Sequence, residues 1–162
     1  RVTAVDLSEA ALERAHGLGA ASLVRSADPV ADIHAATGGG AHVTIDALGS
    51  AATAQAAVRS LRPRGRHVQV GLMLGDAAAA PLPWDVVVAR ELQVFGSHGM
   101  AAADYPAMLA LIADGTLDPR RLVGTVTDLQ GAAAALAAMD QPAASAGITV
   151  ADPRLPSAVS QG

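Results

Sequence analysis

The first six residues constrain the fold more than any other stretch of this chain. They read Arg-Val-Thr-Ala-Val-Asp, an apolar run that ends in Asp6, and Ser8 then opens a helical pattern. This order predicts a short strand, a tight turn and a helix capped by Ser8. An acid at the carboxyl end of a parallel strand, directly before a helix, is where a nucleotide-binding fold holds a ribose. Asp6 is therefore our candidate ribose ligand, and an acid that only caps backbone N–H groups in the turn is the alternative.

The rest of the chain alternates strand and helix patterns at short spacing. The expected strands and helices, in chain order, are 9–16 (helix), 23–24 (strand), 28–36 (helix), 41–48 (strand), 51–61 (helix), 66–72 (strand), 92–95 (strand), 104–113 (helix), 128–140 (helix) and 147–150 (strand). Residues 62–65 read as a turn, 85–89 as a strand or a short connecting helix, and 122–126 as a strand or a connector. The alternation predicts an α/β fold with parallel strands and right-handed crossovers.

Glycines close three of the predicted strands. Gly49, Gly71 and Gly96 stand at or just past carboxyl ends, the edge where ligands bind in open α/β sheets. A residue without Cβ lets a flat ring or a ribose approach the backbone, although turns favour glycine in any case. Three such glycines on the same edge as Asp6 favour a ligand site. His98 follows closely at this edge; we interpret it as a residue that contacts no ligand, with ligand contact as the alternative.

The phosphate-binding fingerprint that should accompany a ribose acid is missing. Gly-x-Gly-x-x-Gly belongs between a strand and a helix, whereas Gly17-Leu18-Gly19 and Gly38-Gly39-Gly40 follow helices. In a doubly wound fold the phosphate loop follows the first strand and the acid ends the second. We therefore expect an incomplete Rossmann sheet that lacks its first strand and Gly-rich loop, both lying before Arg1 in a longer parent. Residues 1–150 would form this partial domain, and residues 151–162 a disordered tail.

Composition argues against several other functions. The chain has 162 residues, 51% of them hydrophobic, which suits one domain with a sizeable core. There is no Cys and no pair of His at metal-ligand spacing, so we predict no metal ligand and no thiol nucleophile. No Ser/His/Asp arrangement stands out, so we predict no catalytic residue. The net charge of -4 and the small Arg59–Arg66 cluster indicate a solvated loop rather than a nucleic-acid surface. No spanning helix or signal peptide is found, which favours a soluble, cytoplasmic protein that does not bind membranes.

In their order along the chain, several segments resemble the zinc-containing alcohol dehydrogenases of the medium-chain dehydrogenase/reductase family. The matching segments are 2–6, 17–20, 43–49, 65–72, 91–100, 104–109, 115–119 and 147–150. The resemblance covers nearly all of residues 1–150. It implies that this chain is the cofactor-binding, carboxyl-terminal part of an oxidoreductase that transfers hydride between an alcohol and NAD.

The resemblance also implies a role for individual positions. Asp6 matches the acid that holds the adenosine ribose, and Leu48 and Gly49 match a turn after the fourth strand that lines the cofactor. Val70, Gly71 and Leu72 match a backbone stretch beside the nicotinamide, and Gly96 and Ser97 match the turn after the sixth strand. The family's catalytic zinc, its ligands and its proton relay have no counterpart here. Zinc would therefore be bound outside this chain, in the parent only, and the isolated chain would be inactive. The family's sixth strand often pairs with its twin across a dimer, which implies a homo-oligomer through residues 92–95.

Two other interpretations stay open. Val5 to Glu9 also suits an S-adenosylmethionine-dependent methyltransferase, in which an acid at this place grips a ribose too. The glycine-ended strands argue against that enzyme. The other is a truncated, non-catalytic interaction module. Without a first strand, the second and fourth strands would face each other across unpaired N–H and C=O groups, which favours mispairing.

Overall fold

The computed structural model describes residues 1–139, 141 and 147–156. They fold into two compact units, each built from two pieces of the chain. The first unit comprises Arg1–Leu7 and Ala20–Met100, and the second comprises Ser8–Gly19 and the residues from Ala101 onward. All the predicted cofactor contacts fall in the first unit.

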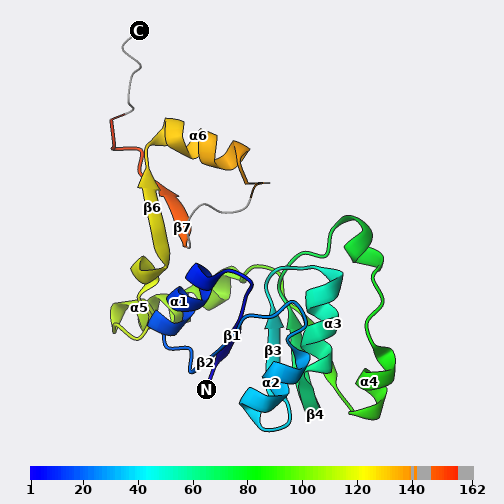
Figure 1. Cartoon of the computed structure of the whole chain (residues 1–162). Helices are drawn as coiled ribbons and strands as arrows, with labels where there is room; N and C mark the ends of the chain where they lie inside the picture. Colours follow the sequence, from blue (N-terminus) through cyan, green and yellow to red (C-terminus); the bar gives the residue numbers. More distant parts are fainter. Residues whose placement is uncertain (140, 142–146, 157–162) are drawn as a thin grey trace. The chain divides into compact units, whose positions relative to one another are not determined.

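The strands of the first unit form two separate parallel sheets (Figure 1). One pairs β1 (Thr3–Val5) with β2 (Ser22–Val24). The other has the order β3 (Ala41–Asp46), β4 (Leu61–Gln69), β5 (Gln93–Gly96). Among the described residues no strand joins β1 to β3, which is where a doubly wound sheet of order 3-2-1-4-5-6 has its first strand. The expected α/β fold with an incomplete Rossmann sheet is confirmed.

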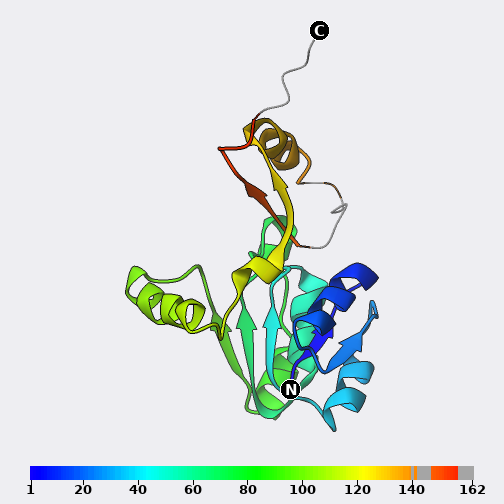
Figure 2. The same cartoon turned by 90° about the vertical axis from the view of Figure 1, so that its left-hand side faces the viewer.

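Helices connect these strands. They are α2 (Val30–Thr37), α3 (Ala51–Arg59), the 3-10 helix η1 (Gly75–Ala79) and α4 (Trp84–Ala89). Among them, α2 and α3 pack on the larger sheet. Helix α2 contacts both β2 and β3, so it bridges the two sheets. Figure 2 shows the strands of both sheets running in roughly the same direction. Helix α3 packs on β3 and β4, where Val58 and Leu61 are fully buried. The core of this unit therefore lies between α3 and the β3–β4 pair.

Local chemistry explains where α2 and α3 begin and end. Ser50 accepts a hydrogen bond from the Thr53 amide, and the Thr53 hydroxyl accepts one from the Ser50 amide, which forms a capping box at the start of α3. Helix α2 ends at Gly38, which adopts the left-handed conformation with φ of 68° that glycine tolerates best. The Thr37 hydroxyl accepts from the Gly40 amide and closes the turn into β3.

The second unit contains a parallel pair of strands, on which one helix packs, and several further helices. Its elements are α1 (Glu9–Gly17), η2 (Ala102–Asp104), α5 (Tyr105–Ala113), η3 (Pro119–Leu122), β6 (Val123–Thr127), α6 (Leu129–Ala137) and β7 (Ile148–Ala151). The Arg14 guanidinium of α1 donates to the carbonyl oxygens of Arg121 at 3.0 Å and Val123 at 3.4 Å. These bonds tie α1 to the start of β6. None of the helices in the described part of the chain is both long and apolar enough to cross a membrane.

Several element boundaries differ from the sequence expectations. Residues 62–65 do not form a separate turn but bulge out of β4, because Ala41 pairs with Leu61 while Val43 already pairs with Arg66. Strand β3 stops at Asp46, two residues early, since the Asp46 side chain accepts from the amides of Leu48 and Gly49 and draws them into a turn. Of the two open segments, 85–89 is helical and 122–126 is a strand. Ala151, assigned to the tail, is the last residue of β7. Residues 140 and 157–162 lie outside the described part.

Candidate cofactor site

Asp6 stands where the sequence places it, directly after β1. Its backbone amide donates to the Val24 carbonyl at 3.2 Å, which extends the β1–β2 pairing by one residue and fixes the position of its Cα. The side chain is exposed. The N-cap of the following helix is Ser8, whose hydroxyl accepts from the Ala11 amide at 3.3 Å. Capping of α1 is therefore a function of Ser8, and Asp6 carries an exposed carboxylate at the carboxyl end of a parallel strand.

The other predicted contacts meet at the carboxyl end of the larger sheet. Asp46, Gln69 and Gly96 are register partners across β3, β4 and β5, so the segments that follow these strands start side by side. The Ser97 amide donates to the Gln69 carbonyl at 2.9 Å and prolongs the pairing by one residue. The structure thus brings the Leu48–Gly49, Val70–Leu72 and Gly96–Ser97 segments to one edge. Asp6 lies at the corresponding end of the smaller sheet.

Gly49 and Gly71 at this edge lie so close that neither position has room for a Cβ. A Cβ on Gly49 would lie 2.3 Å from the Leu72 oxygen, and one on Gly71 would lie 2.3 Å from the Gly49 nitrogen. Gly49 also has a φ of +84°, which side chains rarely adopt. These two segments therefore pack backbone against backbone. Gly96 is different, because a Cβ there would meet no atom within 4 Å.

Apolar side chains, rather than bare glycine backbone, form the accessible part of this edge. Leu48 is 73% exposed, Leu72 is 62% exposed and Val70 is 43% exposed. Leucine and valine side chains left in water at a strand edge can contact an apolar ring. The space beside Gly96 adds room there for a ligand to approach the backbone. His98, exposed two residues beyond Gly96, follows the same edge.

Polar side chains under this edge were not predicted from the sequence. Asp46 is 5% exposed and His67 is 1% exposed, and both hydrogen-bond within a network that includes Gln69. Burial alone would raise the pKa of the Asp46 carboxyl. Hydrogen bonds from Gln69, Gly49, Leu48 and Thr53 outweigh that effect and hold this pKa below its usual value. The signal in the sequence is alternation, since the polar residues recur at every second position of two adjacent strands.

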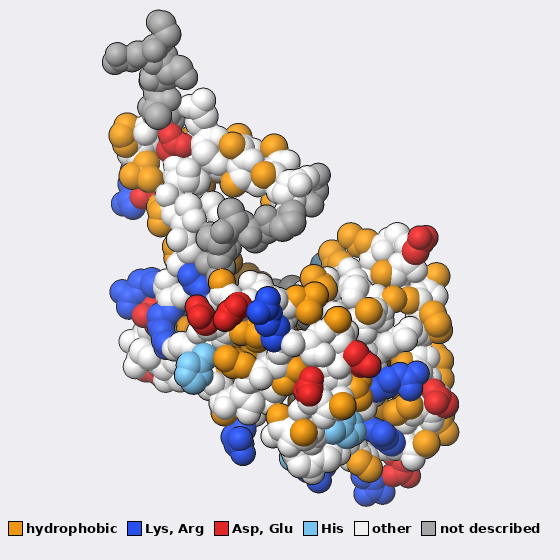
Figure 3. Space-filling view, in the orientation of Figure 1, with side chains coloured by type: hydrophobic (Ala, Val, Ile, Leu, Met, Phe, Trp, Pro, Cys, Tyr) orange, Lys and Arg blue, Asp and Glu red, His pale blue; other side chains and the backbone are white. Residues whose placement is uncertain are grey.

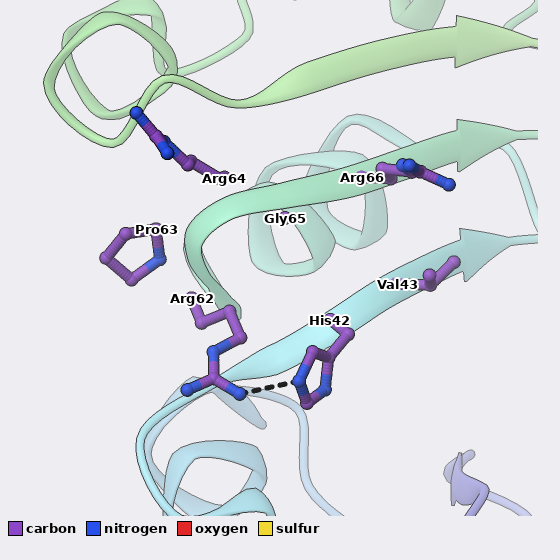
Figure 4. A pocket seen from close by; sticks show the side chains of 7 residues that line it. All are labelled: His42, Val43, Arg62, Pro63, Arg64, Gly65 and Arg66. Atoms are coloured by element: carbon purple, nitrogen blue, oxygen red, sulfur yellow. Dashed lines mark hydrogen bonds between the residues drawn. The ribbon is translucent and has the colours of Figure 1, made fainter.

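A cavity of about 350 Å³ lies at the opposite end of β3, around the bulge of β4 (Figure 4). The Arg62 guanidinium donates to His42 Nε2 at 2.6 Å, and Arg64 pairs with Glu91 at 2.8 Å. In Figure 4 the Arg62, Arg64 and Arg66 side chains point in different directions. Figure 3 shows basic and acidic side chains interspersed over the face that it draws. These arginines are therefore a solvated bulge, as the sequence indicated, and do not converge on an anion.

Comparison with known protein families decides the family. Residues 1–114 match the family described as zinc-binding dehydrogenase. The chain belongs to this family. The suspected resemblance to zinc-containing alcohol dehydrogenases is thereby confirmed.

Named relatives of this zinc-binding dehydrogenase chain are oxidoreductases. It is 36% identical over 135 residues to a Mycobacterium tuberculosis protein named "probable alcohol dehydrogenase", covering 83% of this chain and 37% of that protein. It is 28% identical over 139 residues to "probable D-xylulose reductase A" of Aspergillus terreus, covering 82% and 38%. The crystal structure of an NAD-dependent alcohol dehydrogenase superposes with a TM-score of 0.80 at 28% identity, covering 94% of this chain and 43% of that one. The chain thus spans about two-fifths of the length of the relatives it matches.

The described residues of this zinc-binding dehydrogenase do not fit a zinc ion. No group of three or more His, Cys, Asp or Glu side chains among them lies close enough together to hold a metal. The chain contains no Cys, the ligand that structural zinc sites use most. They do fit part of a dinucleotide, because Asp6 offers a carboxylate at one strand end and Leu48, Val70 and Leu72 offer an apolar surface at another.

Proposed function

We propose that this chain is the cofactor-binding part of an NAD-dependent alcohol dehydrogenase. One observation carries the proposal. In a chain of the zinc-binding dehydrogenase family, exposed Leu48, Val70 and Leu72 gather at the carboxyl edge of β3 and β4, and Asp6 ends β1 at the matching end of the other sheet. This is the edge at which doubly wound folds bind nucleotides.

Each group would act on a different part of the cofactor. The Asp6 carboxylate would accept hydrogen bonds from the two hydroxyls of the adenosine ribose, and its charge would repel a 2′-phosphate, which favours NAD over NADP. Leu48, Val70 and Leu72 would form the wall beside the nicotinamide, with Gly49 and Gly71 keeping the segments in register. The cofactor itself would supply the hydride chemistry. The catalytic zinc and its ligands would belong to residues outside those described.

Three further statements belong to this proposal. The substrate would be a small alcohol or aldehyde, in line with the alcohol dehydrogenases that the chain is similar to. The protein would form a homo-oligomer through β5, an edge strand on which Val94 and Phe95 are partly exposed. It would act in the cytoplasm on the soluble cofactor pool, without nucleic-acid or membrane partners.

Calorimetric titration of the complete gene product with NAD, NADP and S-adenosylmethionine tests the proposal. We expect binding of NAD, weaker binding of NADP and none of S-adenosylmethionine. Asp6→Asn should weaken NAD binding by about tenfold, since hydrogen bonds to a charged group contribute about 1.5–3 kcal/mol, and should change NADP binding less. Asp28→Asn, at an exposed aspartate of the same unit, is the matched control and should leave both affinities unchanged. Binding of S-adenosylmethionine without NAD would support the methyltransferase alternative instead.

A further inference from the structure

A row of polar side chains, some buried and some half-buried, lies on the face of the larger sheet that α3 covers. Thr44 pairs with His67 and Asp46 with Gln69 in the β3–β4 register, so these four residues point to the same face. Thr53 of α3 reaches down to them and donates to Asp46. Every described buried side-chain N or O atom has a hydrogen-bond partner. A fully satisfied network of this kind fixes one arrangement of the groups that it joins.

The hydrogen bonds of Gln69 set the direction of the whole network. Its amide nitrogen donates both to Asp46 Oδ2 and to the Gly71 carbonyl, each at 3.0 Å. Its oxygen faces His67 Nε2 at 3.1 Å, which makes this ring nitrogen the donor. His67 Nδ1 lies 3.1 Å from the Thr44 hydroxyl and would accept from it in the neutral imidazole. Gln69 therefore cannot rotate its amide without losing bonds at both ends.

Asp46 fixes the Leu48–Gly49 segment through hydrogen bonds. Its Oδ1 accepts from the amides of Leu48 at 2.9 Å and Gly49 at 3.1 Å. Its Oδ2 accepts from Gln69 and from the Thr53 hydroxyl at 3.0 Å. The backbone carbonyl of Asp46 also accepts from the amides of Val70 and Gly71, both at 2.9 Å. One residue thus bonds to both segments of the proposed nicotinamide wall.

We propose that Asp46 and Gln69 are positioning residues for the cofactor, joined side chain to side chain so that the Leu48–Gly49 and Val70–Leu72 segments keep one fixed spacing. This inference rests on the proposed function, because it gives these two segments a ligand to position for. Stability alone does not account for the pair. Buried polar networks often contribute no more stability than apolar residues of the same size, whereas they specify geometry. The side-chain bonds of the pair end on the backbone of the two segments whose exposed side chains would contact the ring.

Gln69→Met is the sharpest variant for a test. It keeps the length of the side chain, and Gln69 borders a cavity of about 190 Å³, lined mostly by apolar residues, that can take the thioether. In the complete gene product we expect the NAD dissociation constant to rise about 3- to 10-fold, the scale of one lost hydrogen bond. When NAD is varied at saturating alcohol, the KM for NAD should rise by the same factor, with kcat little changed. The carbonyl ¹³C signal of Gly71 should shift in the free protein as its donor is lost.

Val58→Ala is the matched control. Val58 is fully buried in α3 and its apolar side chain forms none of the hydrogen bonds of the network, so its truncation should destabilise the same unit while leaving those bonds in place. We expect the NAD dissociation constant of this variant to change less than about twofold, with the Gly71 signal unmoved. Equal effects of the two variants on NAD binding would overturn the positioning role, because the loss would then follow stability alone.

The remaining outcomes separate this inference from the proposed function. Unchanged NAD binding in Gln69→Met, with wild-type binding intact, refutes the positioning role only. Failure of the wild type to bind NAD refutes the proposed function, and an unmoved Gly71 signal in Gln69→Met would then also refute the fixed spacing. If Gln69→Met does not fold, Asp46→Asn keeps the side-chain shape and replaces Oδ2 by a donor. This variant should shift the Leu48 and Gly49 amide signals and weaken NAD binding. Unchanged amide signals or unchanged NAD binding would count against the positioning role of the pair.

Discussion

The contact between Gly49 and Gly71 gives a quantitative prediction for Gly71→Ala. The added Cβ would lie 2.3 Å from the Gly49 nitrogen, 2.5 Å from the Leu48 carbonyl carbon and 2.7 Å from the Ala47 carbonyl carbon. All three are backbone atoms, so no side chain can rotate away. Gly71 does not have a left-handed φ, so the cost arises from overlap and not from backbone strain. The two segments must separate for the methyl group to fit.

The magnitude follows from what this separation breaks. Overpacking a close-packed site costs about 1–3 kcal/mol, and backbone neighbours place the value near the upper end. Gly71 also takes part in hydrogen bonds with Asp46 and Gln69, each contributing about 1 kcal/mol. We therefore expect a loss of about 3 kcal/mol in the free energy of unfolding of this unit. With a urea m-value of about 2 kcal/mol/M, the midpoint should fall by about 1.5 M. Circular dichroism at increasing urea concentration measures it.

Gly96→Ala is the matched control for the same methyl group at the same edge. Its Cβ would meet nothing within 4 Å, so the free energy of unfolding should change by less than about 0.5 kcal/mol. NAD binding should nevertheless weaken, because the methyl group would occupy the space beside the backbone. If Gly71→Ala unfolds at the same urea concentration as Gly96→Ala, the two segments are not in backbone contact and the reasoning fails.

Two more predictions concern the surroundings of α3. Because folding lowers the pKa of Asp46, its contribution to stability is complete above the unfolded-state pKa of about 3.9 and is lost as pH falls through the lower folded-state pKa. Melting temperatures measured from pH 6 to pH 3 should therefore converge for wild type and Asp46→Asn below about pH 4, and a constant difference would contradict this sign. Ser50→Ala removes the capping box of α3 and should lower the free energy of unfolding in urea by about 1 kcal/mol. The control is Ser26→Ala before α2, which should lower it by no more than a few tenths of a kcal/mol.

Most of the fold follows from patterns that are local in the sequence. The β-branched run before Gly49, the Ala-rich stretch after Ser50 and Gly38 as a helix stop each predict one element, and the structure contains all three. The bulge in β4 could not be predicted, because Arg62-Pro63-Arg64-Gly65 reads as a turn unless the pairing with Ala41 and Val43 is known. The gap between β1 and β3 was expected, since Asp6 ends the second strand of a doubly wound order and no first strand precedes it in these residues.

Two glycines of the candidate site have a structural role that differs from the reason for which the sequence singled them out. Gly49 and Gly71 were chosen because a missing Cβ lets a ligand approach, but in the structure each leaves room for the backbone of the other. Such a pairing joins positions far apart in sequence, so no local pattern reveals it. The same holds for Asp46 and Gln69, whose bond depends on strand register. Leu48, Val70 and Leu72 are exposed apolar side chains at this edge, and burying them against a bound apolar ring would recover part of the free energy that their exposure costs. At this edge Gly49 and Gly71 therefore belong to a tightly packed backbone, whereas Leu48, Val70 and Leu72 provide an apolar surface.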